Sequence, residues 1–210
     1  MQTRVKICGI TNVLDGLMAA EAGADMVGLM FYERSPRYIT LARAAVISRS
    51  LPPFVLRVGV FVNPDEALVA RAIGECGLSL LQFHGDEPSD FCTQFGIMSL
   101  KAFRLKDASS LVPMESYKTD AFLLDAYSPI GLGGTGEQFS WELAVAAQKF
   151  GKPVFLAGGL TPQNVADAVC QVRPFAVDVS SGVESAPGKK DPTKVRAFVQ
   201  AARSVGSEAA

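Results

Sequence analysis

Eight short apolar runs, separated by longer segments with helical spacing, constrain the fold of this chain more strongly than any other feature of its sequence. Each run is nearly continuous in apolar residues and rich in Val, Leu and Phe, as expected of strands that are buried on both faces. The runs are RVKIC (4–8), MVGLMF (26–31), VLRVGVFV (55–62), LSLLQFH (78–84), MSLKAF (98–103), AFLLDA (121–126), PVFLAG (153–158) and FAVDVS (175–180). Because short apolar runs also occur in buried helices, the intervening segments decide between the two interpretations.

The intervening segments carry helix start and stop signals. Asn63, Thr161 and Asp191 each precede a proline, a pattern typical of a capping residue followed by the first helical turn. Another segment begins at Ser140 and ends at Gly151, where glycine favours the end of a helix. The sequence therefore predicts a strand followed by a helix, repeated along the chain.

Eight strand–helix units fill the 210 residues without a linker or a low-complexity segment. This pattern predicts an α/β fold, a single-domain (β/α)8 TIM barrel over residues 1–210, with residues 204–210 as a frayed tail. An open doubly wound sheet is the alternative, although such a sheet usually has fewer strands at this length.

Charge and cysteine content exclude several classes of partner and site. The formal net charge is −1 and the isoelectric point is about 5.9, so the sequence predicts no binding to nucleic acid or to a membrane surface. No apolar run approaches the roughly 20 residues of a membrane span, and the N-terminus lacks the pattern of a signal peptide, so we expect a cytoplasmic protein. Four dispersed cysteines and one histidine do not match a His/Cys zinc site, and we expect no metal.

The functional residues of a (β/α)8 barrel lie at the carboxyl ends of its strands, and Cys8 ends the first predicted strand. Cys8 is either a packed small hydrophobic residue or a thiol at the mouth of the barrel, where Gly9 would let the backbone turn away. It shares a strand face with Lys6 and Arg4, and a nearby cation would favour the thiolate, which can abstract a proton. The other cysteines lie in or beside predicted helices and are interpreted as packed: Cys76, Cys92 and Cys170.

Asp125, Arg37 and His84 also lie at predicted strand ends or in the loops that follow them. Asp125 is either a structural cap or an acid/base group, and the glycine-rich loop after it favours the second interpretation. Arg37 is either a solvated side chain or a two-pronged clamp for a carboxylate. His84 is either a hydrogen-bonded structural histidine or a contact to a substrate.

Glycine-rich stretches follow the last three predicted strands. AGGL, with Gly158 and Gly159, and SSGVE, which begins at Ser180, place small residues where backbone N–H groups can approach an anion. Tight turns alone would also require glycine, but the two stretches in adjacent loops together favour a phosphate site. GLGGTG (131–136) lacks the Lys-Ser/Thr of a P-loop and is interpreted as a loop that closes over a ligand.

Several motifs occur together, in order, over nearly the whole chain: KICGIT, FYERSPRYIT, GVFVN, LQFHGDE, LLDAYSPIGLGGTGEQFSW, AGGL and DVSSGVESAPGKKD. In this combination the chain strongly resembles the N-(5′-phosphoribosyl)anthranilate isomerases of tryptophan biosynthesis. The resemblance implies an Amadori rearrangement of N-(5-phospho-β-D-ribosyl)anthranilate to 1-(2-carboxyphenylamino)-1-deoxy-D-ribulose 5-phosphate. It implies a small-molecule substrate and no metal or organic cofactor, and we expect a monomer or a homodimer.

The resemblance also implies roles for individual residues. Cys8 would be the general base and Asp125 the general acid, which protonates the ribose ring oxygen before Cys8 removes the C2′ proton. Arg37 would hold the anthranilate carboxylate, and Asp178 would line the pocket. The phosphate would be bound by Gly134, Thr135, Gly158, Gly159, Ser180, Ser181 and Gly182.

Other functions are compatible with parts of the sequence. A different phosphosugar isomerase or epimerase could use the same fold, but metal-dependent epimerases need several His and Asp ligands. Related histidine-pathway isomerases carry an aspartate where this chain has Cys8. A catalytically silent phosphate-binding barrel would be expected to lack Cys8 or Asp125, whereas both are present. A redox-sensing Cys8 would need a resolving cysteine, and none lies near it in the sequence.

Overall fold

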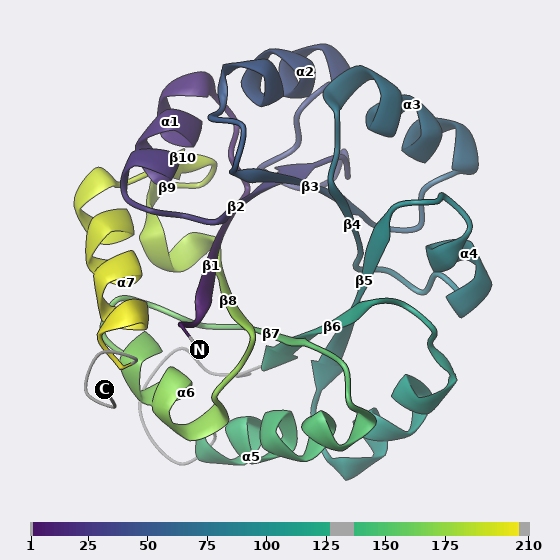
Figure 1. Cartoon of the computed structure of the whole chain (residues 1–210), viewed down its shortest axis with the longest axis vertical. Helices are drawn as coiled ribbons and strands as arrows, with labels where there is room; N and C mark the ends of the chain where they lie inside the picture. The colour runs from purple at the N-terminus through teal and green to yellow at the C-terminus, as the bar shows by residue number, and fades with distance from the viewer. Residues whose placement is uncertain (1, 127–136, 206–210) are drawn as a thin grey trace.

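The computed structural model describes residues 2–126 and 137–205. In this part of the chain eight parallel strands form a closed barrel, and the helices surround it (Figure 1). The barrel strands are β1 (Arg4–Cys8), β2 (Met26–Met30), β3 (Leu56–Phe61), β4 (Leu80–Phe83), β5 (Met98–Leu105), β6 (Ala121–Ala126), β7 (Val154–Ala157) and β8 (Ala176–Val179). The α-helices are α1 (Val13–Glu21), α2 (Leu41–Ser50), α3 (Glu66–Cys76), α4 (Ser89–Thr93), α5 (Glu137–Ala147), α6 (Val165–Val172) and α7 (Pro192–Ser204). The 3-10 helices are η1 (Ala108–Ser116), η2 (Gln148–Phe150) and η3 (Ser181–Val183), and a hairpin after β8 consists of β9 (Glu184–Ala186) and β10 (Lys189–Lys190).

The barrel closes because β1 pairs with β2 on one side and with β8 on the other. An open sheet would leave two of its strands with an unpaired edge. The pairing of β1 with β8 therefore excludes the doubly wound alternative and confirms the predicted (β/α)8 barrel. The register of β1 sets Cys8 opposite Gly28 and Lys6 opposite Asp178. Closure therefore brings side chains from the two ends of the sequence together.

Apolar side chains form two separate cores because successive residues of a strand point to opposite sides of the barrel wall. The outer core lies between the strands and the surrounding helices. The inner core contains Ala121 and Leu123 of β6 together with Phe155 of β7. Asp125 follows two residues after Leu123, so it faces the interior at the carboxyl end of β6.

The cap of α3 differs from the sequence prediction. Asp65, not Asn63, caps this helix, since its Oδ1 accepts a hydrogen bond from Leu68 N at 2.7 Å. Asn63 has a φ of 47°, and its Oδ1 accepts a hydrogen bond from Asp86 N at 2.7 Å. It therefore joins the loop between β3 and α3 to the loop after β4. The predicted cap of α7 is confirmed, because Asp191 accepts from the backbone of the first helical turn.

Helices α5 and α6 begin at other residues than predicted. The N-cap position of α6 is Asn164 rather than Thr161, and Asn164 Oδ1 accepts from Thr161 N at 2.8 Å, which closes a turn before the helix. Helix α5 already begins at Glu137, before the predicted start at Ser140. Gly151 adopts the left-handed conformation and ends η2, so the predicted stop after this segment is confirmed.

The remaining helices differ from expectation only in detail. Helix α7 continues through Ser204, the first residue of the predicted frayed tail, and residues 206–210 lie outside the described part of the chain. The connection from β5 to β6 is the 3-10 helix η1, which contains Pro113.

Among the residues that the structure describes, no helix combines the length and the apolar character that crossing a membrane requires.

Candidate active site

Polar side chains gather at the carboxyl end of the barrel, where this fold carries its binding sites. Cys8 ends β1, His84 follows β4, Asp125 lies near the end of β6 and Asp178 lies in β8. By strand alternation all four share the interior face with the inner core. The fold thus brings together four of the side chains that the sequence singled out.

Cys8 packs against the neighbouring strand. Cys8 is 6% exposed, and Gly28 lies opposite it on β2. A Cβ atom at position 28 would lie 2.6 Å from Cys8 Sγ and 3.0 Å from Cys8 Cα, closer than packed atoms approach. Gly28, which the sequence analysis did not identify, therefore leaves the space that the thiol occupies.

Lys6 and Asp178 form a buried ion pair next to Cys8. Lys6 Nζ lies 2.9 Å from Asp178 Oδ1, and the Lys6 side chain is completely buried. Burial alone would lower the pKa of Lys6, but Asp178 and Cys8 together raise it above its ordinary value, so Lys6 stays charged. Asp178 therefore has a fixed internal partner, which the sequence did not predict.

Burial raises the pKa of the Cys8 thiol above its ordinary value, although Lys6 and Lys190 act in the opposite direction. Lys6 therefore favours the thiolate as predicted, but the net shift of the Cys8 pKa is upward. Two physical causes account for this: the thiol is removed from water, and Asp178 balances the charge of Lys6. Burial therefore favours the protonated thiol over the thiolate at neutral pH.

Arg37 lies in the loop between β2 and α2 and packs on the residue that follows Cys8. A Cβ atom at Gly9 would lie only 2.5 Å from Arg37 Cδ, so the arginine stem rests directly on that glycine. The guanidinium forms a two-pronged ion pair with Glu184, in which Nε donates to Oε1 at 2.8 Å and Nη2 to Oε2 at 2.7 Å. Arg37 is therefore not a solvated side chain, and its first carboxylate partner belongs to the chain itself.

His84 and Asp125 meet across the ends of β4 and β6. His84 Nε2 lies 3.6 Å from Asp125 Oδ2, and the two side chains are 24% and 30% exposed. Gln82 Nε2 lies 3.0 Å from His84 Nδ1, while Gln82 Oε1 is buried without a hydrogen-bond partner among the described residues. Asp125 is thus held beside an imidazole and remains accessible to a ligand, which suits a group that exchanges a proton.

The glycine-rich loops after β7 and β8 lie against each other. Gly158 and Gly159 have φ values of 85° and 64°, and a Cβ atom at Gly182 would overlap the carbonyl oxygen of Leu160. Ser180 Oγ is buried and has no partner among the described residues. These loops therefore offer small residues and an unpaired hydroxyl in one place, as an anion site requires.

Two residues of the predicted phosphate site are outside the part of the chain that the structure describes. These residues are Gly134 and Thr135, which belong to the GLGGTG stretch at 131–136.

In the part of the chain that the structure describes, no three His, Cys, Asp or Glu side chains are grouped as a metal ion would require.

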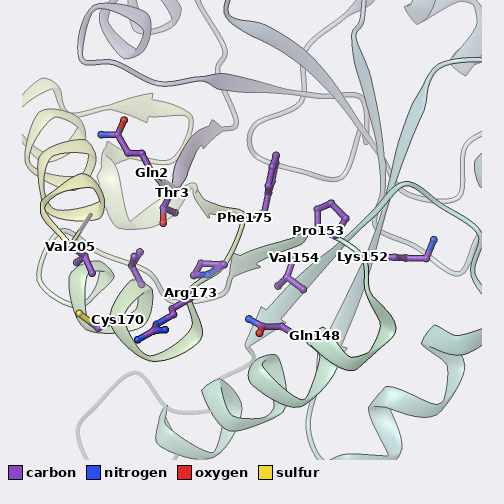
Figure 2. Close-up of a pocket in the computed structure, with 12 residues that line it drawn as sticks. Gln2, Thr3, Gln148, Lys152, Pro153, Val154, Cys170, Arg173, Phe175 and Val205 are labelled. Atoms are coloured by element: carbon purple, nitrogen blue, oxygen red, sulfur yellow. The ribbon is translucent and has the colours of Figure 1, made fainter. Parts of the chain in front are cut away.

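A cavity of about 870 Å³ lies at the opposite, amino end of the barrel. Figure 2 shows the side chains that line it. Its lining includes Pro153 and Phe175, which precede β7 and β8, and Cys170 of α6. Cys170 is exposed, so the prediction that it is packed is wrong. Cys76 and Cys92 are buried as predicted.

A second cavity, of about 450 Å³, lies at the carboxyl ends of β4 and β5. It is lined in part by His84 and belongs to the candidate site.

The chain is similar to known proteins over nearly its whole length. A family model described as N-(5′-phosphoribosyl)anthranilate (PRA) isomerase matches residues 5–201. The N-(5′-phosphoribosyl)anthranilate isomerase of Geotalea uraniireducens is 55% identical over 201 residues, which cover 96% of this chain and 98% of that protein. The crystal structure of phosphoribosyl anthranilate isomerase from Thermotoga maritima is 42% identical with a TM-score of 0.90, and the match covers 97% of this chain and 100% of that one. A crystal structure of such an isomerase in complex with reduced 1-(o-carboxyphenylamino)-1-deoxyribulose 5-phosphate is 40% identical with a TM-score of 0.88, again over 97% and 100% of the two chains.

Proposed function

The chain belongs to the N-(5′-phosphoribosyl)anthranilate isomerase family of tryptophan biosynthesis, and on this basis we propose that Cys8 is its general base and Asp125 its general acid. The observation that carries the assignment is that both side chains face the interior at the carboxyl ends of their strands, β1 and β6. Because β7 and β8 separate these strands around the wall, a substrate bound between them meets the two groups from different sides. Such an arrangement suits a reaction in which one side chain donates a proton to the substrate and the other removes a proton from it.

The proposed reaction is an internal oxidation and reduction of the sugar. Asp125 donates a proton to the ribose ring oxygen as the bond between that oxygen and C1′ breaks, which leaves a Schiff base between C1′ and the anthranilate nitrogen. Cys8 in its thiolate form then takes the proton from C2′ and becomes a thiol, and the electron pair of that C–H bond moves toward the imine nitrogen. The resulting enolamine tautomerises to the ketone, so C2′ is oxidised while C1′ is reduced. The substrate's own imine accepts the electrons, so these steps need no further co-reactant.

The charged groups around Cys8 support its role as a base. Lys6 and Lys190 lower the pKa of Cys8 and Asp178 raises it, and Arg37 also interacts with the Cys8 charge. The cations favour the thiolate once the proton has left, and they offset part of the effect of burial. The general base thus forms its anion inside a preformed positive environment.

The substrate carries a carboxylate and a phosphate, and the site has a candidate group for each. We assign the anthranilate carboxylate to Arg37, which lies beside the end of β1, and we assign His84 and Asp178 to the substrate pocket. The phosphate is assigned to the loops after β7 and β8, with Gly158, Gly159 and residues 180–182, and to Gly134 and Thr135. A related isomerase binds the reduced product, which contains both anionic groups, in its crystal structure.

The activity is tested by incubating the purified protein with freshly prepared N-(5-phosphoribosyl)anthranilate and following the loss of substrate fluorescence. We expect turnover of about 1 to 1000 per second, the common range for enzymes, and no change with heat-denatured protein. A protein that binds the reduced product but does not convert the substrate would instead be a catalytically silent barrel.

We expect Gly28→Ala to lower kcat by at least about tenfold, because the added methyl group occupies the place of the Cys8 thiol and displaces the base. The measurement is kcat together with the rate at which iodoacetamide modifies Cys8 in a Cys170→Ser background. Gly74→Ala is the matched control, since a Cβ atom there meets no other atom within 4 Å. Full activity of Gly28→Ala would show that the thiol position does not matter.

A further inference from the structure

Glu184 is a buried carboxylate at the start of the hairpin after β8, and it accepts hydrogen bonds from two cationic side chains. Besides the two bonds from Arg37, Lys190 Nζ donates to Glu184 Oε1 at 2.9 Å and Gly188 N donates to it at 3.3 Å. The side chains of Glu184 and Lys190 are 5% and 0% exposed. Removing these charges from water is costly, so their retention calls for a role other than stability alone.

The hairpin that carries Glu184 is anchored to the barrel at several points. Thr11 Oγ1 donates to Gly188 O at 2.6 Å, and Lys190 N donates to Asp15 Oδ2 at 2.9 Å. Figure 1 shows the hairpin, β9 and β10, beside α1. The carboxylate of Glu184 therefore has a fixed position relative to β1 and α1.

Glu184 occupies only one edge of the Arg37 guanidinium. Nε and Nη2 point to Glu184, whereas Nη1 has no partner among the described residues. A guanidinium can bind two carboxylates at once through different edges. The side chain of Arg37 is 21% exposed, so its remaining donors are accessible from the site.

We propose that Glu184 is a positioning residue that orients Arg37, so that the remaining edge of the guanidinium recognises the aromatic carboxylate of the substrate. Lys190 completes this arrangement, since it compensates part of the charge of Glu184 and leaves Arg37 with its attraction for a second carboxylate. The inference rests on the proposed function, which assigns the substrate carboxylate to Arg37. It adds that the recognition of this group depends on a residue that does not touch the substrate.

The test compares two ligands that differ by one group. The first is reduced 1-(o-carboxyphenylamino)-1-deoxyribulose 5-phosphate, and the second is the same compound without the carboxylate. Calorimetric titration of wild type and Glu184→Gln gives the ratio of the two affinities for each protein. We expect Glu184→Gln to lower affinity for the first ligand by about tenfold, to leave the second unchanged, and to raise KM more than it lowers kcat.

Glu184→Gln leaves the buried charge of Lys190 without its anionic partner, which lowers stability. The double variant Glu184→Gln/Lys190→Met removes both charges, and we expect the same loss of discrimination in it. Asp25→Asn is the matched control, since it weakens an ion pair with Arg203 at the amino end of the barrel, where Arg203 Nη2 lies 3.1 Å from Asp25 Oδ2. This variant should keep the wild-type affinity ratio.

Each outcome has a separate meaning. Equal affinity of wild type for both ligands would contradict the assignment of the carboxylate to Arg37 in the proposed function. A wild type that discriminates, with Glu184→Gln and the double variant discriminating equally well, would overturn the present inference alone. Loss of affinity for both ligands to the same extent would reduce Glu184 to a structural role and would also overturn it.

Discussion

Replacing Cys8 with serine is expected to lower kcat by about a thousandfold, because an alcohol loses its proton far less readily than a thiol and so supplies almost no anion to act as the base. The substitution is nearly isosteric and the position is buried against Gly28, so the fold has little reason to change. The measurement is steady-state turnover of N-(5-phosphoribosyl)anthranilate, with thermal unfolding of both proteins as a control. A Cys8→Ser protein with more than a tenth of wild-type activity would rule out Cys8 as the general base.

The ionisation of Cys8 is a second test of the same role. Because burial raises the pKa of this thiol, it is protonated at low and neutral pH and loses its proton only as the pH rises through the raised value. The thiolate absorbance that wild type has and Cys8→Ser lacks should therefore appear above the ordinary thiol pKa of about 8.5. A thiolate already present at neutral pH would mean that Lys6 and Lys190 outweigh burial.

Asp125→Asn should lower kcat by about a hundredfold to ten-thousandfold, since an amide cannot donate the proton that opens the sugar ring. Asp125 is partly exposed and its contact with His84 is long, 3.6 Å, so the loss of charge costs little stability. The same assay measures the effect. A reduced kcat with nearly unchanged affinity for the reduced product would assign the loss to chemistry and not to binding.

Asp120→Asn is the matched control for Asp125→Asn at the other end of β6. Asp120 precedes β6 at the amino end of the barrel, where its Oδ2 accepts from Ser99 N at 2.7 Å. This variant should keep kcat close to that of wild type. If both variants lost activity equally, the effect would come from a disturbed strand, and the assignment of Asp125 as general acid would fail.

The barrel was predictable because its signals are local. Apolar runs such as RVKIC and AFLLDA coincide with β1 and β6, and the Asp191-Pro192 start of α7 follows from capping chemistry within one turn. Asn63 was not predictable as a loop contact, since its side chain binds the backbone of Asp86 in the next strand's loop. The exposed position of Cys170 likewise depends on which face α6 turns to the barrel.

The candidate site was predictable only in part. Cys8 and Asp125 followed from their positions at strand ends and from a family resemblance, and the interior placement of Asp125 now rests on its inner-core neighbours on β6. Gly28 and Glu184 were missed as site residues, although Glu184 lies within the quoted DVSSGVESAPGKKD motif. No local pattern marks a glycine as the space for a thiol on the next strand, or a glutamate as the partner of an arginine 147 residues away.

The sequence by itself determined the order of strands and helices, since hydrophobic periodicity and capping act between residues that are near one another in the chain. Only the tertiary structure decided which charges face each other and how Cys8 ionises. Lys6 and Asp178 are 172 residues apart, yet closure of the barrel sets them 2.9 Å from each other. Burial and Coulomb interactions depend on distance in space and on the exclusion of water, and both arise only when β8 pairs with β1.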